Sequence, residues 1–269
     1  MSTLGTILKD NWEWRGQIFQ LAVFDLKKQI RGAVLGWAWF VIKPAVYIAC
    51  FWFGIKIGLR AGHVAPGAAP YILWLSAGII PWFFMKDMLS GGIDVMHRYP
   101  YLVTKVKFPI GGIPTIYVLS SLAVQLLMMV LLLILYFACG QPLDIHLVQV
   151  PVLLAVMCAF WWLFSMFMSP LCAISKDIKN LMGALSTPFF WLSGVIFNVR
   201  DVPVDWIQAA LYFNPITALV TGFRDAFYER VWVWEDPTIC VCFGVVFAVT
   251  LAVAVIVYKK TSEKVADVL

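Results

Sequence analysis

Residues that usually take part in catalysis or binding are few in this chain, and their spacing excludes the usual site for ATP hydrolysis. The sequence holds no GxxxxGK[ST] phosphate loop and no Gly-Lys pair at all, so the usual cradle for a nucleotide is missing. The six cysteines form no CxxC pair, and His63, His97 and His146 lie in separate segments. The residues therefore indicate no catalytic group, no metal site and no cofactor bound by this chain.

Acidic residues are absent from the centres of the apolar segments. The nearest one, Asp87, stands beside Lys86 at the end of a segment. A carrier driven by protons or sodium usually needs an intramembrane carboxylate or an unwound ion site. Coupling to protons is therefore not expected.

Lys43 is the charged residue most open to a functional role, because it lies well inside the first apolar segment, directly before Pro44. A cation in lipid is costly unless its stem reaches the headgroups or it faces a cavity. Two interpretations follow. The side chain extends toward the inner headgroups, or it attracts an anionic headgroup, such as a phosphate, that enters from the inner leaflet.

Aromatic residues make up 16% of the chain and recur along one helical face. The steps between Trp37, Phe40, Tyr47 and Phe51 place them together, and more aromatic residues follow in the next segment. Such rings suit the apolar faces of sugars, but they also form ordinary membrane belts and helix contacts. The candidate substrate path is Trp37, Phe40, Lys43, Tyr47, Phe51, Trp82, Phe83 and Phe84.

The composition requires that these residues lie in a membrane. Hydrophobic residues make up 62% of the 269 residues and charged residues only 13%, too little polar surface for a soluble protein. An all-α integral membrane protein is predicted, with apolar segments that approach the length needed to cross a bilayer. The fifth segment is short and holds Pro188 and Gly194, so it either spans or re-enters. The six predicted segments are Ala33–Gly58, Tyr71–Met88, Ile113–Cys139, Val148–Ile174, Leu181–Phe197 and Ile239–Tyr258.

Lysine and arginine predict the orientation. Fourteen of them fall on the side that holds both termini, and four, Arg60, Arg200, Arg224 and Arg230, fall on the other. Both termini are therefore expected in the cytoplasm. We predict one transmembrane domain over 1–269, made of a cytoplasmic amphipathic helix (1–32), six spans (33–258) and a cytoplasmic tail (259–269).

The first thirty or so residues have helical periodicity without the length of a span. Leu8, Trp12, Phe19, Ala22 and Leu26 share one face, and charged or amide residues occupy the other. This pattern favours a helix that lies in the inner interface over an ordinary soluble helix, because no soluble domain is available to cover it.

On the outer side, residues 204–227 show the same periodicity in two short stretches. Two short helices are predicted there, joined at Asn214-Pro215 and resting at the outer interface.

The inner loop from Arg98 to Pro109 is short, basic and aromatic, and it ends in proline. A segment of this kind could dock as a helix in a groove of a cytosolic partner. It could equally be a plain positive anchor at the inner surface.

Taken together, these residues resemble the membrane-spanning subunits of type-2 ABC exporters, in the branch that exports lipid-linked O-antigen, capsular polysaccharide or wall teichoic acid. The stretch Phe51–Gly62 looks most like the teichoic-acid exporters, which are slightly preferred. One departure is Lys43, where such proteins often have asparagine. The matching motifs are Phe24–Trp39 with Lys43-Pro44, Ala77–Phe84, Leu102–Pro109, Asn214-Pro215, Gly222–Asp225 and the tail Glu263–Leu269.

The resemblance implies a permease subunit in a bacterial cytoplasmic membrane. It also implies a homodimer with two cytosolic ATPase subunits, which would bind the ATP and Mg²⁺, and a lipid-linked (undecaprenyl diphosphate-type) glycan as substrate. The segment that couples to the ATPase would hold Tyr101, Leu102, Lys105, Lys107 and Phe108. Two other classes stay open from the residues alone, namely a stand-alone secondary carrier or channel and a membrane-embedded glycolipid transferase.

Overall fold

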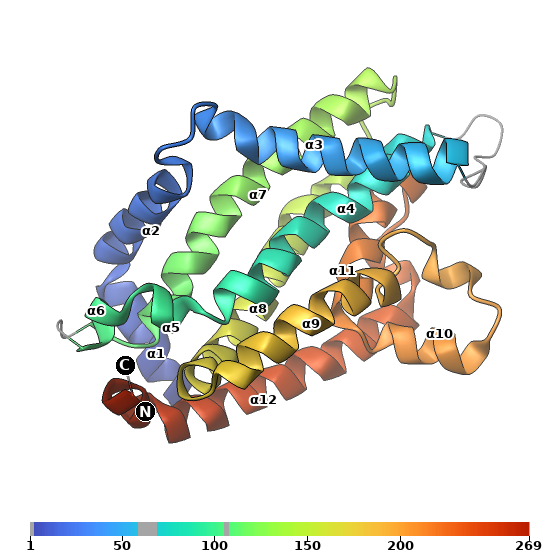
Figure 1. The fold of residues 1–269 in the computed structure, drawn as a ribbon. Coiled ribbons are helices and arrows are strands. Elements are labelled where there is room, and N and C mark those ends of the chain that lie inside the picture. The colour runs from blue at the N-terminus through green and yellow to red at the C-terminus, as the bar shows by residue number, and fades with distance from the viewer. Residues whose placement is uncertain (1–2, 59–68, 105–107, 269) are drawn as a thin grey trace.

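The computed structural model describes residues 3–58, 69–104 and 108–268, and these form helices joined by turns and short connections, without a β-strand. The long helices pack side by side in a bundle, in which the helix at Trp39–Trp52 runs at an angle to its neighbours (Figure 1). Their bounds are α1 Thr3–Glu13, α2 Arg15–Ile30, α3 Trp39–Trp52, α4 Tyr71–Asp87, α5 Val95–Arg98, α6 Pro100–Thr104, α7 Gly112–Ala138, α8 Gln149–Ile174, α9 Lys176–Leu192, α10 Asp205–Tyr212, α11 Pro215–Arg224 and α12 Pro237–Val268.

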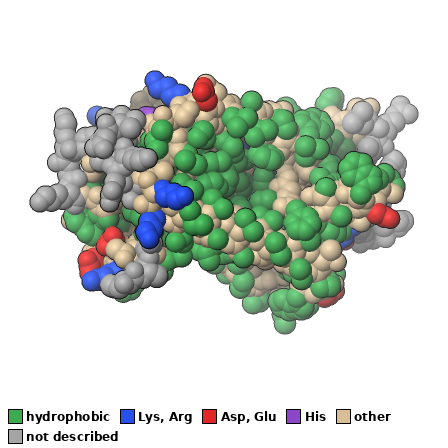
Figure 2. Space-filling model, turned by 90° about the horizontal axis from the view of Figure 1, so that it is seen from below, with side chains coloured by type: hydrophobic (Ala, Val, Ile, Leu, Met, Phe, Trp, Pro, Cys, Tyr) green, Lys and Arg blue, Asp and Glu red, His purple; other side chains and the backbone are tan. Residues whose placement is uncertain are grey.

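Two ends of the bundle are named here for reference. The terminal end holds α1, α5, α6 and the last turns of α12, and both ends of the chain lie there (Figure 1). The distal end holds α10 and the start of α12. Figure 2 shows hydrophobic side chains over most of one long face, whereas the lysines and arginines visible there gather toward the terminal end. This distribution is typical of a protein whose flank is covered by lipid.

Among the described residues, five helical segments are long and apolar enough to cross a membrane, and they agree with five of the six predicted segments. The remaining one, the fifth predicted segment, corresponds to α9, which has 17 residues and is not among the five helical segments. It runs from the terminal end toward α10 (Figure 1) and stops where Gly194 takes a positive φ of 67°. The five segments are Gly36–Gly58, Tyr71–Gly92, Gly112–Ala138, Ile145–Ile174 and Pro237–Thr261.

The spans differ sharply in how far the chain itself buries them. In α4, 78% of the apolar stretch is buried, and its neighbours are α3, α7 and α11. In the segment that contains α3 the share is 6%, and in that of α12 it is 11%. Exposed side chains such as Val46, Phe53 and Val249 cannot face water in such numbers, so these two helices face lipid or another subunit.

The predicted N-terminal helix is two helices, α1 and α2, which meet at Trp14. Leu8, Trp12 and Phe19 are exposed, as an interfacial helix requires, while Ile18 and Ala22 pack against the bundle. Helix α2 lies against α7. The buried face of the segment therefore belongs to the fold itself.

The two predicted short helices on the other side are α10 and α11. Asn214 caps α11 by accepting a hydrogen bond from the Ile216 amide at 3.0 Å, and Pro215 occupies the first helical position. The prediction that α11 rests at the surface is wrong. Its residues Ile216–Arg224 are buried, and the helix packs against α4. Its apolar face is covered by protein.

Candidate functional site

Lys43 lies in the first turns of α3 and faces a groove between α3 and its neighbours. It lines two adjoining cavities of about 240 and 390 Å³. Both cavities are also lined by Gln29, Trp39 and Phe40, so they form one polar space at the start of α3. The Lys43 ammonium lies 5.8 Å from the centre of the Trp39 ring and forms no ion pair with the described acidic residues. Its charge is therefore available to a ligand.

Helix α7 forms the opposite wall of this space and contributes a buried amide. Gln125 is only 2% exposed, and its side-chain nitrogen has no hydrogen-bond partner among the described residues. A buried donor without a partner is costly, because it has given up water without replacement. Gln125 lines the smaller cavity together with Lys43, so an acceptor bound there would lie beside this amide.

Asp87, at the end of α4, is the acid that lines the same cavity. Its carboxylate accepts hydrogen bonds from the Tyr117 hydroxyl at 2.8 Å and the Ser121 hydroxyl at 2.6 Å, both on α7. These bonds hold Asp87 against α7 and occupy both of its oxygens. Asp87 thus links α4 to α7 at the edge of the cavity.

A third cavity, of about 300 Å³, continues the space toward the distal end between α3, α4 and α7. It shares Pro44 and Met128 with the Lys43 cavity, and its other walls are apolar apart from Ser76. We call the three cavities together the α3 groove. It has a polar part near the start of α3 and an apolar part further along the same helix.

The predicted aromatic path falls into two groups, which meet where the Phe83 ring lies 5.3 Å from the Tyr47 ring. Phe40, Phe83 and Phe84 line the α3 groove with Lys43. Tyr47 and Phe51 lie one and two turns further on, and their rings are 5.9 and 5.2 Å from that of Phe190 on α9. The second group is therefore an aromatic cluster between α3, α4 and α9.

The two remaining predicted path residues differ in exposure. Trp82 is 1% exposed and its ring lies 5.5 Å from that of Phe190, so it is a core residue of this cluster. Trp37 lies outside α3, on a 3-10 turn at Gly36–Ala38, and half of its side chain is exposed. The regular spacing from Trp37 to Phe51 thus does not correspond to one continuous α-helix.

In the predicted coupling segment, Tyr101 and Leu102 lie in the short helix α6, which directly follows α5, and Lys105 and Lys107 lie outside the described residues. Tyr101 is 43% exposed, whereas Leu102 and Phe108 are buried. The Phe108 ring packs edge-on against Trp14 at 5.3 Å. Of the three predicted contact residues that the structure describes, Tyr101 is therefore the one open to a partner.

Two ion pairs attach α5, and Asp94 directly before it, to the bundle. Arg98 lies 3.6 Å from the buried Asp25 of α2 and stacks over the Tyr117 ring at 4.6 Å. Burial lowers the pKa of Arg98, but the neighbouring Tyr117 and Asp25 more than compensate and raise it. On the other flank, Lys179 of α9 donates to Asp94 at 2.7 Å, and this hydrogen bond raises the pKa of Lys179. These contacts connect α5 and Asp94 to α2, α7 and α9, so a movement of α5 would be transmitted to those three helices.

The same flank brings Cys172 of α8 close to Asp94 and His97, which lie only three residues apart in the sequence. Candidate ligand atoms of Asp94, His97 and Cys172 lie within 4.8 Å of one another. The Asp94 carboxylate is already engaged, by the Lys179 ammonium and, at 3.1 Å, by the His97 ring nitrogen. These bonds explain the cluster as part of the attachment of α5.

At the distal end the buried charges are paired. The Arg224 guanidinium lies 3.4 Å from the centre of the Trp74 ring and donates to the carbonyls of Trp74, Gly194, Val195 and Phe197. It thereby satisfies three carbonyl groups of the turn that follows α9 and one carbonyl of α4. Gly78 makes room for it, because a Cβ there would lie 2.5 Å from a guanidinium nitrogen.

Arg200 forms a second group of polar contacts at the distal end. It donates to both oxygens of Asp225, at 2.7 and 3.0 Å, and to Asp236 at 3.2 Å. The bond to Asp225 raises the pKa of Arg200, while burial raises that of Asp225. Asp225 lies at the end of α11 and Asp236 lies directly before α12. Arg200 therefore connects these two helices at the distal end.

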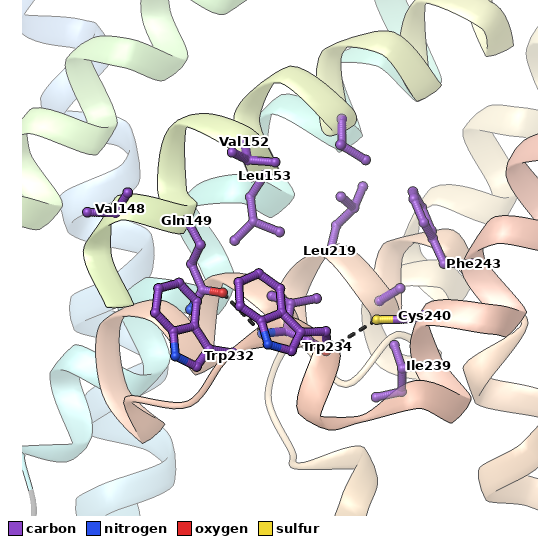
Figure 3. A pocket seen from close by; sticks show the side chains of 13 residues that line it. Val148, Gln149, Val152, Leu153, Leu219, Trp232, Trp234, Ile239, Cys240 and Phe243 are labelled. Carbon is purple, nitrogen blue, oxygen red and sulfur yellow. Dashed lines mark hydrogen bonds between the residues drawn. The ribbon is translucent and has the colours of Figure 1, made fainter. Parts of the chain in front are cut away.

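The distal end also holds a cavity of about 450 Å³ between α8, α11 and the start of α12. Figure 3 shows Trp232 and Trp234 side by side against it, with stacked rings 4.6 Å apart. Gln149 is its polar residue, and both amide atoms are bonded, the nitrogen to the Val231 carbonyl at 2.8 Å and the oxygen to the Val233 amide at 3.1 Å. This cavity offers apolar surface and no free polar group from Gln149.

Sequence reasoning missed Gln29, Gln125 and Phe190 as members of these sites. For Gln125 a signal exists, since it is a polar residue in the middle of the apolar stretch Gly112–Ala138. Gln29 lies in the amphipathic segment, where an amide is ordinary. Phe190 is one of many aromatic residues, and nothing in its spacing distinguishes it.

Comparison with known proteins assigns a family. The model of the ABC-2 type transporter family matches residues 16–228. A curated protein of Myxococcus xanthus, the O-antigen export system permease protein RfbA, is 22% identical over 262 residues, which cover 97% of this chain and 98% of that protein. The protein of the same name from Klebsiella pneumoniae is 20% identical over 261 residues, with 94% and 96% covered.

Proposed function

The chain belongs to the ABC-2 type transporter family, and we propose that it is the permease subunit of an ATP-driven polysaccharide exporter. The family match, which extends from α2 to the segment after α11, carries this proposal. The sequence has no phosphate loop, which supports a separate ATPase partner, because an ATP-driven transporter subunit that cannot bind the nucleotide itself needs one. The five apolar helices are consistent with a multi-pass membrane protein.

The proposed substrate is a lipid-linked glycan. Both relatives are named as O-antigen export permeases, which favours a bacterial surface polysaccharide. The stretch Phe51–Gly62 favours a teichoic acid within the same chemical class. In either case the cargo has a long polar polymer and a lipid anchor that carries phosphate, so the permease must handle both.

In the proposed assembly two copies of the chain face each other, with the terminal end in the cytoplasm. The weak burial of α3 supports a partner subunit on that side. The aromatic cluster of Tyr47, Phe51 and Phe190 would then lie close to a path between the copies, where rings can slide along sugar faces. Each copy would bind one cytosolic ATPase subunit.

The proposed mechanism starts at α5 and α6. When ATP closes the ATPase pair, it would push the coupling segment around Tyr101, which is exposed for such a contact. The ion pairs of Arg98 with Asp25 and of Lys179 with Asp94 would pass the movement to α2 and α9. Since α9 borders the aromatic cluster, its movement would change the width of the path.

The coupling segment is tested by reversing its charge. We expect Lys105→Glu combined with Lys107→Glu to reduce co-purification of the ATPase subunit at least tenfold while membrane insertion stays normal. The matched control is Lys259→Glu with Lys260→Glu, a double reversal at the same end of the molecule. Unchanged co-purification and unchanged export in the first variant would contradict the coupling role.

The substrate is tested by depletion of the protein in its host. Accumulation of a lipid-linked polymer on the cytoplasmic side is expected, and chemical analysis of that polymer would decide between O-antigen, capsule and teichoic acid. Uphill transport by the purified chain alone would exclude the proposal. Turnover of a lipid-linked sugar without any partner would select a transferase instead.

A further inference from the structure

The polar part of the α3 groove contains two donors that nothing in the described chain bonds to, and a third unbonded group, the buried Ser76 hydroxyl, lies in its apolar part. Lys43 has no acidic partner, and the Gln125 amide nitrogen is buried without an acceptor. They come from different helices, α3 and α7, and line the same cavity of about 240 Å³. A cation beside an amide donor is a suitable arrangement for phosphate oxygens, which accept several hydrogen bonds at once.

The acid in this cavity does not remove that preference. Asp87 accepts two hydrogen bonds from α7, and Arg98 beyond it adds a positive charge. Gln29, which contributes the third polar wall, is held by Asp25 at 3.2 Å. Lys43 thus remains the charge in the groove without a protein partner.

The groove also has a place for a chain. From the polar part, the cavity of about 300 Å³ leads away between α3, α4 and α7, with walls formed by residues such as Ile48, Ile72 and Leu135. This apolar branch adjoins the polar part at Pro44 and Met128. A polar head with one tail in the branch fits this shape.

We propose that the α3 groove binds a single-chain lipid phosphate, with the phosphate between Lys43 and Gln125 and the chain in the apolar part. This inference rests on the proposed function, since the phosphate-bearing lipid end of the exported glycan is the occupant it assigns. Helix α3 is largely unburied, so a lipid can reach the groove from the side without opening the bundle. The groove would hold the anchor while the polymer takes the path.

The binding test uses the purified full chain in detergent and a set of simple probes. Native mass spectrometry would measure the affinity for farnesyl phosphate, for farnesol as the uncharged lipid of the same chain, for phosphatidylglycerol and for inorganic phosphate. We expect farnesyl phosphate to bind at least tenfold more tightly than each of the others. Equal binding of farnesol would overturn the role of the phosphate, and tighter binding of phosphatidylglycerol would overturn the single chain. Equal binding of inorganic phosphate would overturn the claim that the groove recognises the lipid chain.

Variants then locate the site. Lys43→Met should weaken farnesyl phosphate binding roughly tenfold or more, because it removes a charge-assisted contact. Lys43→Arg should retain most of the affinity, and Gln125→Leu should lose roughly threefold to tenfold. Lys86→Met is the matched control, since Lys86 is exposed near the end of α4 and does not line the groove. Loss of binding in Lys86→Met equal to that in Lys43→Met would overturn the assignment.

Transport separates this inference from the proposed function. With the ATPase partner in vesicles, Lys43→Met should export the lipid-linked substrate at least fivefold more slowly than Lys86→Met. Normal export by Lys43→Met would overturn the groove as the anchor site and leave the exporter intact. Lipid binding that depends on Lys43, together with no export by the native complex, would count against the exporter alone.

Discussion

Two buried glutamines, Gln125 in the α3 groove and Gln149 in the distal cavity, are in opposite situations. They are 2% and 5% exposed, and each lines a cavity between helices. Gln149 uses both ends of its amide to hold residues 231–233 against α8. The nitrogen of Gln125 holds nothing. The same side chain therefore serves as a structural clamp in one cavity and as an open donor in the other.

The difference teaches how to separate a gap in packing from a binding site. The distal cavity, of about 450 Å³, is larger than the cavity of about 240 Å³ that Lys43 and Gln125 share. However, the charges near the distal end are paired, with Arg224 on four carbonyls and Arg200 on two acids. In the α3 groove Lys43 forms no ion pair with the described acids, and the Gln125 amide nitrogen and the Ser76 hydroxyl are buried without partners. An unsatisfied buried donor is evidence for a ligand that volume alone does not provide.

The largest effect is expected where pairing is densest. Arg224→Met should lower the free energy of unfolding by about 3 kcal/mol, because four carbonyls around the end of α9 lose a charged donor. Thermal unfolding in detergent would measure it. Gly78→Ala, which places a Cβ against the guanidinium, should act in the same direction. A melting temperature unchanged in both variants would show that the distal pairing is not structural.

An intermediate effect is expected at the clamp. Gln149→Leu leaves the Val231 carbonyl and the Val233 amide without their partner, which should cost about 2 kcal/mol. The same thermal assay applies, and hydrogen exchange at residues 231–233 should rise with it. Val152→Ala, at an exposed position of the same cavity, is the control. Stability equal to that of the native chain would remove the contrast between the two glutamines.

The smallest effect should have the opposite sign. Without lipid, Gln125→Leu should leave the free energy of unfolding unchanged or raise it by up to about 1 kcal/mol, because a buried donor without a partner disappears. With farnesyl phosphate present, the native chain should gain more thermal stability than the variant. Destabilisation of the lipid-free variant comparable to that of Gln149→Leu would mean that Gln125 is a clamp as well.

Much of the fold could be predicted from local pattern. Five apolar stretches, the joint at Asn214-Pro215 and the short helices beside it follow from length, periodicity and capping, which nearby residues determine. The burial of α11 could not be predicted. Periodicity shows that a face is apolar, but whether lipid or α4 covers that face depends on contacts between residues about 150 positions apart, such as Arg224 with Trp74.

The candidate site was predictable only in its charge. Lys43 inside an apolar segment is conspicuous, and the sequence leaves open whether it faces headgroups or a cavity. The structure places it in a groove, with Gln29 and Gln125 from other helices. The prediction of one aromatic face from Trp37 to Phe51 was incomplete, because the chain forms a 3-10 turn at Trp37 before α3 begins. Tertiary contacts of this kind leave no regular spacing.

The weak burial of α3 has a consequence for how the molecule keeps its shape. This helix has few neighbours within its own chain, and Pro44 removes one of its internal hydrogen bonds. Its position is therefore set largely by molecules that surround the chain, whether acyl tails, detergent or a second copy. For α3, the solvent is a component of the architecture, and a change of membrane thickness or composition is in effect a change in the fold's own boundary conditions.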